Sequence, residues 1–434
     1  MDFLISPLRK PLTGEIVFLG DKSVSVRLVL LSLILKGKIT LGNLPFSEDV
    51  KSSLKAVNDM GVKLLKENDC FVLENTEPLR ERGELPLTIY CGNSATLARL
   101  FLGLSANLPG IYELSGDDSL SNRPMMRVVE PLRKAGLNIS FLKKEGCLPL
   151  RIESKGQTEF IEWENKASSA QVDSSLLFAS LSSEKPFKVS SPHTFRDHTE
   201  RLFAFLFARE NLRHSEKLSF LTKTNHELYF YIPGDISSAA YFILLALLKP
   251  GSDILIKDVL LNDSRTAFIR KLQEAGGAIT LHIKGESFEK YGDVRVTASS
   301  LKAFTVEPEE AASMIDELPL LAAAMAFANG TSEVSGAWEL RVKESDRIAC
   351  LISQLKKLGV SCEEKPDGFK IFGGFSQASN IVLDSFGDHR LAMTFSVLAS
   401  LLPNPLMIMN ADCVNISCPD FFEKLKFYGG KNVE

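Results

Sequence analysis

A polar turn followed at once by an apolar, helix-length run recurs six times along the chain. Subtracting the positions of the central residues of successive turns gives spacings of 72, 76, 66, 81 and 72 residues. Asp, Asn and Ser accept hydrogen bonds from the unsatisfied N–H groups at helix N-termini, so each turn predicts a helix start. Six copies at a near-constant step indicate a structural repeat. The central residues are Asp21, Asn93, Ser169, Asp235, Asp316 and Asp388.

A second, amphipathic helix is predicted in each repeat, because a helical pattern ends at Gly in five copies and at Asn211 in the third. Gly and Asn both suit the left-handed backbone that closes many helices. Alternating β-branched stretches, such as 62–65 and 278–282, follow most of these ends and predict strands. The repeat is therefore strand, buried helix, strand, amphipathic helix and further strands. The terminal glycines are Gly61, Gly136, Gly276, Gly359 and Gly429.

The length of the chain, 434 residues, exceeds what a single hydrophobic core usually supports. Six repeats do not fit one domain of ordinary size, whereas three in each of two domains do. We expect the break near residues 231–234, where a strand pattern meets the fourth turn. The fold class predicted is α/β with two domains.

Composition narrows the kind of protein this chain can be. It is 45% hydrophobic and 24% charged, which is typical of a globular protein. The longest apolar runs, 28–35 and 241–248, are too short to span a bilayer, so no membrane association is expected. A net charge of −4 argues against a nucleic-acid partner. Seven cysteines without a Cys-x-x-Cys pair, and an N-terminus unlike a signal peptide, favour reduced thiols in the cytoplasm.

Cations and hydroxyls gather at the predicted helix starts. The first helix of each repeat is apolar nearly all round and is therefore expected to be buried, with its N-terminus open to a ligand. Two facing domains would then aim six positive helix ends at one cleft, which favours an anionic ligand. A charged run, 339–347, is expected to begin as a strand and to become a helix at Ser345, so that Lys343 and Arg347 both reach a substrate. The cations at helix starts are Lys22, Arg27, Arg99, Arg347 and Arg390.

Five motifs together resemble one enzyme family. The segment 20–27 is similar to the GSKSxSxR motif of the 5-enolpyruvylshikimate-3-phosphate synthases, and segments 92–96, 123–125, 341–347 and 387–390 are similar to further motifs of that family in order and spacing. The resemblance implies a two-domain inside-out α/β barrel with three βαβαββ repeats per domain around buried helices. It further implies an N-terminal domain of residues 20–233 that binds mainly shikimate 3-phosphate, and a discontinuous domain of residues 1–19 and 234–434.

The glyphosate-tolerant second class of this family is the one that the chain resembles, through segments 169–171, 196–200 and 339–345. Glyphosate-sensitive relatives carry a Gly-Asn-x-Gly-Thr type motif at the turn that is residues 92–96 here, and this chain has Ala95 in place of the second Gly. We therefore expect tolerance of glyphosate. The chain departs from the family pattern at Asp21, where Ser is usual, and at Asp173, where Lys is usual. Some relatives have a phosphoenolpyruvate-contacting Lys where this chain has Ile416, so we assign that position no role.

The resemblance implies transfer of the enolpyruvyl group of phosphoenolpyruvate to the 5-hydroxyl of shikimate 3-phosphate, with release of phosphate, in the shikimate pathway to chorismate and the aromatic amino acids. It implies no cofactor and no metal, and we expect a monomer. The implied ligands of shikimate 3-phosphate are Lys22, Ser23, Arg27, Ser169, Ala170, Gln171, Arg196, Asp316 and Lys343. The implied ligands of phosphoenolpyruvate are Lys22, Ala95, Arg123, Gln171, Arg347 and Arg390.

The implied mechanism is addition followed by elimination through a tetrahedral ketal-phosphate, which needs a base for the hydroxyl and an acid for the methylene carbon. Asp316 is the expected base, although it could instead be a helix cap that anchors the hydroxyl. Glu344 is expected to move the methylene proton, with Lys343 as a partner and Lys22 also in the catalytic set.

Two alternatives stay open from the residues. One is the related UDP-N-acetylglucosamine enolpyruvyl transferase, which carries a reactive Cys near the position of Arg123. No Cys lies between Cys91 and Cys147 here, which counts against that enzyme. The other is a non-catalytic phosphate- or sugar-binding scaffold. The intact set of Asp316, Glu344 and cations counts against the scaffold.

Overall fold

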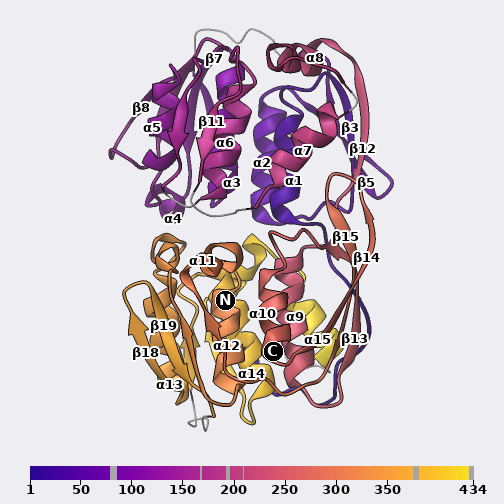
Figure 1. Cartoon of the computed structure of the whole chain (residues 1–434), viewed down its shortest axis with the longest axis vertical. Coiled ribbons are helices and arrows are strands. Elements are labelled where there is room, and N and C mark those ends of the chain that lie inside the picture. The colour runs from indigo at the N-terminus through magenta and orange to yellow at the C-terminus, as the bar shows by residue number, and fades with distance from the viewer. Residues whose placement is uncertain (79–85, 167–168, 192–195, 209, 375–380, 430–434) are drawn as a thin grey trace. The chain divides into compact units, whose positions relative to one another are not determined.

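Contacts divide the computed structural model into two compact units (Figure 1). The N-terminal unit comprises residues 19–233 and 287–289, and the C-terminal unit comprises residues 1–18, 234–286 and 290–434. The chain therefore passes from one unit to the other four times. The residues described are 1–78, 86–166, 169–191, 196–208, 210–374 and 381–429.

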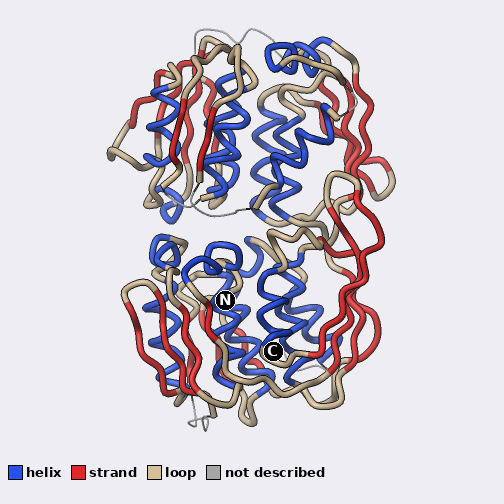
Figure 2. The backbone as a smooth tube through the Cα atoms, viewed as in Figure 1, coloured by secondary structure: helices blue, strands red, loops and turns tan. Residues whose placement is uncertain are grey.

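The first helix of every repeat is present and buried. All ten residues of α3 are buried, as are twelve residues of α9. In the N-terminal unit α3 packs against both α1 and α6, and in the C-terminal unit the three corresponding helices pack against one another (Figure 2). These helices are α1 (Lys22–Leu31), α3 (Ala95–Leu104), α6 (Ala170–Ser180), α9 (Ile236–Leu248), α12 (Leu318–Phe327) and α14 (His389–Leu401).

The predicted amphipathic helices are also present. At the end of four of them Gly61, Gly136, Gly276 and Gly359 have φ between +91° and +100°, the left-handed conformation that the sequence predicts. The second helices are α2 (Glu48–Asp59), α5 (Met126–Lys134), α7 (His198–Phe207), α10 (Ala267–Glu274), α13 (Arg347–Leu358) and α15 (Phe421–Gly429). Short helices complete the set: α4 (Asp118–Ser121), α8 (Lys217–Lys223), α11 (Pro308–Ala311), η1 (Ser105–Asn107), η2 (His214–Glu216), η3 (Ala312–Met314), η4 (Trp338–Val342) and η5 (Ala411–Ile416).

Four sheets share one strand order, in which a parallel pair is extended by two antiparallel strands. In the N-terminal unit they are β12 (His226–Tyr231), β3 (Gly37–Gly42), β5 (Cys70–Asn75) and β4 (Lys63–Glu67), and β6 (Leu87–Tyr90), β7 (Gly110–Ser115), β9 (Leu150–Ser154) and β8 (Asn138–Phe141). In the C-terminal unit they are β2 (Thr13–Val17), β13 (Asp253–Leu260), β15 (Lys290–Thr297) and β14 (Ala278–Glu286), and β16 (Thr305–Val306), β17 (Thr331–Val334), β19 (Gly368–Phe372) and β18 (Ser361–Lys365).

Two strands are exchanged between the halves of the sequence. Strand β2 precedes α1 in the chain but pairs in parallel with β13 of the C-terminal unit, and β12 precedes α9 but pairs in parallel with β3 of the N-terminal unit. Gly37 permits the second pairing, because a Cβ there would lie 2.1 Å from the carbonyl oxygen of His226. The exchange makes the C-terminal unit discontinuous.

The third and sixth repeats have smaller sheets. In the third repeat β10 (Glu162–Glu164) pairs in parallel with β11 (Lys188–Ser190). In the sixth, β20 (Val382–Asp384) pairs in parallel with β21 (Leu406–Met409), and β1 (Phe3–Ile5) adds an antiparallel strand from the N-terminus. The N-terminal strand thus completes the last repeat.

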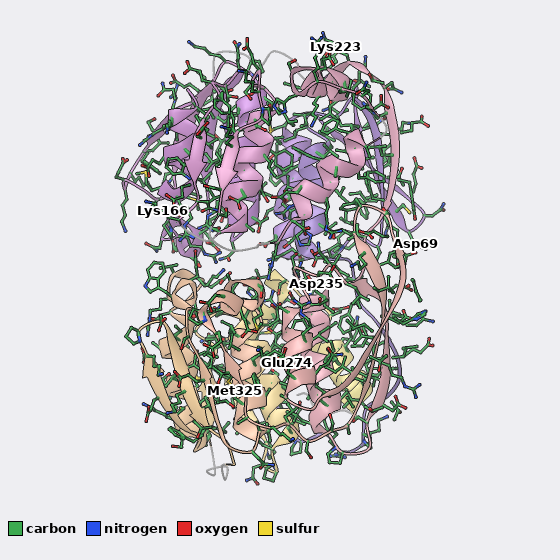
Figure 3. The ribbon with its side chains drawn as sticks, in the orientation of Figure 1. Asp69, Lys166, Lys223, Asp235, Glu274 and Met325 are labelled. Atoms are coloured by element: carbon green, nitrogen blue, oxygen red, sulfur yellow. The ribbon has the colours of Figure 1, made fainter. Side chains whose placement is uncertain are left out.

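Apolar side chains fill the region between helices and sheets within each unit. Met325 on α12 is fully buried, whereas Lys166 and Lys223 point outward from their unit (Figure 3). None of the described helices combines the length and apolar character needed to cross a bilayer. All seven cysteines are free thiols.

Three local expectations are wrong. Ser94, not Asn93, caps α3, because its hydroxyl accepts the N–H of Leu97. Glu317, not Asp316, occupies the N-cap position of α12. The start of the charged run 339–347 is not a strand: residues 338–342 form the 3₁₀-helix η4, and α13 begins at Arg347 rather than Ser345.

Candidate active site

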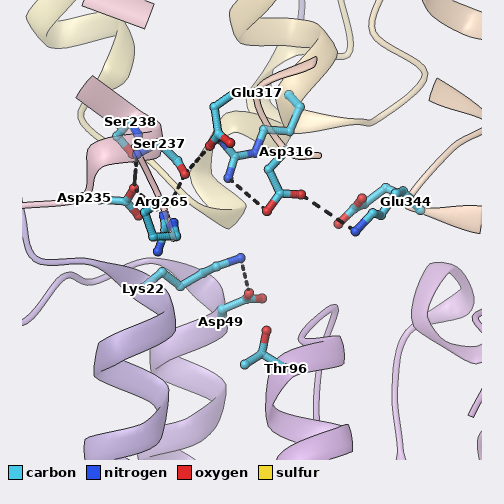
Figure 4. Close-up of polar contacts among 12 residues, drawn as sticks. Lys22, Asp49, Thr96, Asp235, Ser237, Ser238, Arg265, Asp316, Glu317 and Glu344 are labelled. Atoms are coloured by element: carbon cyan, nitrogen blue, oxygen red, sulfur yellow. Dashed lines mark hydrogen bonds and ion pairs between the residues drawn. The ribbon is translucent and has the colours of Figure 1, made fainter. Parts of the chain in front are cut away.

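The first turn of α1 presents Lys22 and Ser23, which follow the cap residue Asp21. The Asp21 carboxylate accepts the N–H of Val24, so this departure from the family pattern serves as the helix cap. Lys22 Nζ lies 2.9 Å from Asp49 Oδ2, and the Asp49 side chain is nearly buried (Figure 4). Asp49 therefore fixes the ammonium group of Lys22 at the helix start.

Arg27 is buried one turn further along α1. It donates from Nε to Thr199 Oγ1, from Nη1 to the carbonyl of Ser23 and from Nη2 to Ser174 Oγ, at 2.8–2.9 Å. Burial lowers the pKa of Arg27 to about 10, although Glu200 opposes that shift. These bonds set the direction of the guanidinium group and join α1 to α6 and α7.

Gln171 is fixed from two sides at the start of α6. Its Oε1 accepts from Arg99 Nη1 at 2.6 Å, and its Nε2 donates to Thr96 Oγ1 at 3.0 Å. Ala95, the first residue of α3, adjoins Thr96 and is 7% exposed. The predicted residues Ala95 and Gln171 are therefore linked through the first turn of α3.

Arg123 follows the short helix α4. Its Nη2 donates to Asn93 Oδ1 at 2.8 Å, and the amide of Asn93 donates to Asp117 Oδ2 at 2.8 Å. Asp117 in turn caps α4 by accepting from the N–H of Leu120. This chain of bonds ties Arg123 to the turn that precedes α3, where the resemblance places a phosphoenolpyruvate ligand.

The remaining predicted ligands of the N-terminal unit lie at helix starts. Ser169 is the N-cap residue of α6, but its side chain makes no capping hydrogen bond within the described residues, and Ala170 is the first helical residue. Ser168, the first residue of the polar turn 168–171 that the sequence predicts before this helix, lies outside the described residues. Arg196 lies two residues before α7 and is half-buried. Asp173, the second departure, accepts from Asn165 and Ser191 on the same unit.

In the C-terminal unit, the carboxylate of Asp316 is close to three cations. Its Oδ1 lies 3.8 Å from Lys343 Nζ and 3.5 Å from Arg347 Nη1, and its Oδ2 lies 4.0 Å from Arg390 Nη2. These residues come from three separate segments of the chain, the first and last of which, at Asp316 and Arg390, are 74 positions apart. The structure therefore brings together the four predicted residues Asp316, Lys343, Arg347 and Arg390.

Arg347 is 1% exposed and is held by two more carboxylates. Its Nε donates to Asp388 Oδ2 at 2.7 Å, and its Nη2 donates to Glu344 Oε2 at 2.5 Å. Burial disfavours the cation, but Asp388 and Glu344 outweigh burial and raise the pKa of Arg347. Within the part of the chain that the structure describes, Nη1 donates no hydrogen bond, although it lies 3.5 Å from Asp316 Oδ1.

Lys343 precedes this arginine by four positions and lies in the link between η4 and α13. Burial lowers the pKa of Lys343, while the nearby Asp316 acts in the opposite direction. A lysine with a lowered pKa can exchange a proton more readily near neutral pH than an ordinary one. The carboxylate of the adjacent residue, Glu344, forms an ion pair with Arg347.

A polar network adjoins this cluster at the starts of α9 and α12. Glu317 Oε1 accepts from Ser237 Oγ at 2.5 Å and lies 3.9 Å from Arg390 Nη1. Arg265 Nη2 donates to the same hydroxyl at 2.8 Å (Figure 4). The network thus gives Arg390 a second carboxylate neighbour, Glu317, in addition to Asp316.

Sequence reasoning missed the carboxylates that hold the predicted cations, namely Asp49, Glu317 and, in this role, Asp388. Asp388 was identified as a helix cap, which it is, but its second oxygen binds Arg347. Asp49 and Glu317 are charged residues in otherwise buried surroundings, and their separation from Lys22 and Arg390 by 27 and 73 positions leaves no local pattern to find. Among the described residues no group of three His, Cys, Asp or Glu side chains could hold a metal ion.

Comparison with known proteins gives a consistent result. The family model described as EPSP synthase (3-phosphoshikimate 1-carboxyvinyltransferase) matches residues 8–425. A protein from Aquifex aeolicus named 3-phosphoshikimate 1-carboxyvinyltransferase is 40% identical over 425 residues, which cover 96% of this chain and 97% of the relative. A protein of the same name from Carboxydothermus hydrogenoformans is 38% identical over 427 residues, which cover 97% of this chain and 98% of the relative.

Solved structures agree over the full length. An EPSP synthase from Acinetobacter baumannii matches with a TM-score of 0.83 and 31% identity, and covers 100% of this chain and 99% of its own. The enolpyruvyl transferase NikO from Streptomyces tendae matches with a TM-score of 0.76 at 12% identity, so it shares the fold. The two-domain inside-out α/β architecture that the motifs imply is thus confirmed.

Proposed function

Since this chain belongs to the EPSP synthase (3-phosphoshikimate 1-carboxyvinyltransferase) family, we propose that the two clusters of charged side chains described above bind and activate its two substrates. The enzyme transfers the enolpyruvyl group of phosphoenolpyruvate to shikimate 3-phosphate in the shikimate pathway. The single observation that carries the proposal is the carboxylate of Asp316 beside three cations, Lys343, Arg347 and Arg390.

Shikimate 3-phosphate is proposed to bind mainly to the N-terminal unit. Arg27 and Gln171 are each fixed by hydrogen bonds to neighbouring helices, so they would meet a ligand without losing much side-chain entropy. The helix starts add backbone N–H groups that favour a phosphate. The proposed ligands are Lys22, Ser23, Arg27, Ser169, Ala170, Gln171 and Arg196, with Asp316 and Lys343 from the C-terminal unit.

Phosphoenolpyruvate is proposed to bind to arginines of both units. Nη1 of buried Arg347 supports this, because it makes no hydrogen bond and has only the longer ion pair to Asp316 at 3.5 Å, so a phosphate or carboxylate oxygen would supply its hydrogen-bond acceptor. Charge-assisted bonds to such oxygens are among the strongest available. The proposed ligands are Lys22, Ala95, Arg123, Gln171, Arg347 and Arg390.

Asp316 is proposed as the base that removes the proton of the 5-hydroxyl as its oxygen bonds to the central carbon of phosphoenolpyruvate. The methylene carbon gains a proton in the same addition, and loses one again when phosphate leaves. Glu344 is proposed to move that proton, with Lys343 as its partner because of its lowered pKa. The alternative role of Asp316 as the cap of α12 is not supported, since Glu317 occupies the cap position.

Three finer points belong to the same proposal. The Ala at position 95, in the first turn of α3, supports membership of the glyphosate-tolerant second class. We also propose that the enzyme is a monomer and that it acts in the cytoplasm, as expected from its free thiols. No metal or cofactor is included in the proposed reaction.

The test of the proposed site is a continuous assay of phosphate release from phosphoenolpyruvate, with and without shikimate 3-phosphate. The wild type should release phosphate only when shikimate 3-phosphate is present. Replacing Arg347 by Gln should raise KM for phosphoenolpyruvate by a factor of ten or more, because a buried charge-assisted contact is lost. Arg295→Gln, an exposed change on β15, is the matched control and should leave the assay unchanged. An Arg347→Gln enzyme with wild-type KM would contradict the assignment.

A further inference from the structure

The tip of the β14–β15 hairpin is packed inside the N-terminal unit. The two strands belong to the C-terminal unit, but the three residues that join them, Ser287–Glu289, belong to the N-terminal unit. Phe288 is 5% exposed, and its ring lies edge-on to Phe230 of β12 at 5.4 Å and 6.2 Å from Phe205 of α7. Phe288 and Glu289 of this strand connection are thus buried among elements of a unit to which their strands do not belong, whereas Ser287 is exposed.

Glu289 carries a carboxylate into that buried position. It is 1% exposed, and its Oε1 lies 2.5 Å from Nδ1 of His198, which is fully buried. A buried carboxylate is costly unless a donor satisfies it, and the N–H of the imidazole ring supplies that donor. His198 is the first residue of α7. The pair therefore fixes the start of α7 to the hairpin tip.

The start of α7 also holds a predicted substrate ligand. Thr199, the next residue, accepts the hydrogen bond from Arg27 Nε at 2.9 Å. Burial lowers the pKa of Arg27, and Glu289 is among the carboxylates that oppose this shift and favour the cation. Arg196 lies only two residues before His198. The start of α7 thus connects Glu289 to two cations. Arg27 is connected through its hydrogen bond to Thr199, and Arg196 is connected because it lies two residues before His198 in the chain.

We propose that Glu289 is a positioning residue for shikimate 3-phosphate, which acts through His198 on the start of α7 and so on Arg27 and Arg196. The inference rests on the proposed function, in which those two arginines bind that substrate. Glu289 itself touches no substrate in this account.

Binding of shikimate 3-phosphate to the full-length enzyme, measured by isothermal titration calorimetry, tests the proposal. Glu289→Gln and His198→Gln should each raise Kd about tenfold, since each removes a buried charge-assisted hydrogen bond. The Kd of the double variant should exceed that of the more weakly binding single variant by no more than about threefold, because the two residues act as one unit. KM for phosphoenolpyruvate at saturating shikimate 3-phosphate should stay within about twofold of the wild type.

Two control variants and one conservative variant separate positioning from simple packing. Phe288→Leu removes the aromatic ring at the same tip but keeps the carboxylate, so it should lower thermal stability while leaving Kd for shikimate 3-phosphate within about twofold. Glu286→Gln removes an exposed carboxylate three residues away and should leave Kd unchanged. Glu289→Asp keeps the charge on a shorter side chain and should recover part of the affinity that Glu289→Gln loses.

Unchanged Kd in both Glu289→Gln and His198→Gln overturns the proposal. So does an equal rise in both substrate constants, or an effect of Phe288→Leu as large as that of Glu289→Gln, because each would indicate general loss of structure. If Glu289→Gln does not fold, His198→Gln and Glu289→Asp decide the question. Failure of the proposed function is distinguishable: the wild type would then not bind shikimate 3-phosphate, or Arg27→Lys would bind it as the wild type does.

Discussion

Nε of Arg347 lies 2.7 Å from Oδ2 of Asp388, so the first residue of α13 is bonded to the residue that caps α14. The other oxygen of Asp388 accepts the N–H of Arg390. One carboxylate therefore holds one predicted phosphoenolpyruvate ligand by its side chain and another by its backbone. This relationship predicts that Asp388 matters for both stability and substrate binding.

Asp388→Asn should destabilise the enzyme by roughly 2–4 kcal/mol, because it removes one partner of a buried ion pair while the helix cap is retained. Equilibrium urea denaturation checks this value. The matched control is Asp263→Asn, an exposed residue paired with Lys290, for which a change below about 1 kcal/mol is expected. Equal effects of the two substitutions would show that Arg347 does not depend on Asp388.

Asp316→Ala should lower kcat by orders of magnitude while Kd for both substrates stays within about tenfold, as for loss of a general base. Steady-state kinetics with calorimetric Kd values separate the two effects. Glu309→Gln, at an exposed position on α11, is the control for loss of a nearby carboxylate. Near-normal turnover in Asp316→Ala would transfer the base role to Glu344 or Lys343.

Lys343 should make activity sensitive to alkaline pH. Burial lowers its pKa, so its positive charge is lost at a lower pH than that of an exposed lysine. If the charge is needed for substrate binding, kcat/KM for shikimate 3-phosphate should fall as pH rises through that lowered pKa. Lys343→Arg keeps the charge to higher pH and should shift the alkaline fall upward. An alkaline limb at the same pH in both enzymes would exclude Lys343 as its origin.

Arg123→Ala should weaken phosphoenolpyruvate binding chiefly, because Arg123 is nearly buried and is aimed by its bond to Asn93. KM for phosphoenolpyruvate should rise at least tenfold, with a much smaller change for shikimate 3-phosphate. Arg133→Ala, a more exposed arginine on α5, is the control and should change neither constant. A rise in KM for shikimate 3-phosphate alone would contradict the placement of Arg123.

Ala95→Gly should convert a glyphosate-tolerant enzyme into a sensitive one. Ala95 is nearly buried in the first turn of α3, and its methyl group would crowd a ligand longer than phosphoenolpyruvate. Crowding of about 1–3 kcal/mol corresponds to roughly ten- to a hundredfold weaker inhibition in the wild type. Titration with glyphosate at fixed phosphoenolpyruvate gives the two inhibition constants. Equal inhibition constants for the two enzymes would show that the methyl group of Ala95 does not affect glyphosate binding and serves only helix formation.

The repeat architecture could be predicted because its signal is local. A helix such as α9 is apolar on all sides, and a Gly such as Gly359 marks where α13 ends. The exchange of β2 and β12 could not be read from the repeat, because strand partners depend on contacts distant in sequence. The resemblance alone implied that the C-terminal domain is discontinuous.

The local errors also have physical causes. Asn93 resembles a cap residue, but its amide is engaged by Asp117 and Arg123, and the neighbouring Ser94 caps the helix instead. Asp316 resembles a cap too, yet its carboxylate faces Lys343 and Arg347, about thirty positions later in its own repeat, and Arg390 of the next repeat. In both cases long-range charge and hydrogen-bond partners decided the outcome, and a single sequence does not contain them as a pattern.

The most direct test of the whole account is a ³¹P NMR time course with phosphoenolpyruvate and shikimate 3-phosphate, for wild type and Asp316→Ala. In the wild type the phosphoenolpyruvate signal should disappear while inorganic phosphate and a new phosphate monoester signal, that of the enolpyruvyl product, grow in equal amounts. Asp316→Ala should bind both substrates and form neither signal on the same timescale. Phosphate release without the new monoester, or equal rates in the two enzymes, would contradict enolpyruvyl transfer at the Asp316 cluster.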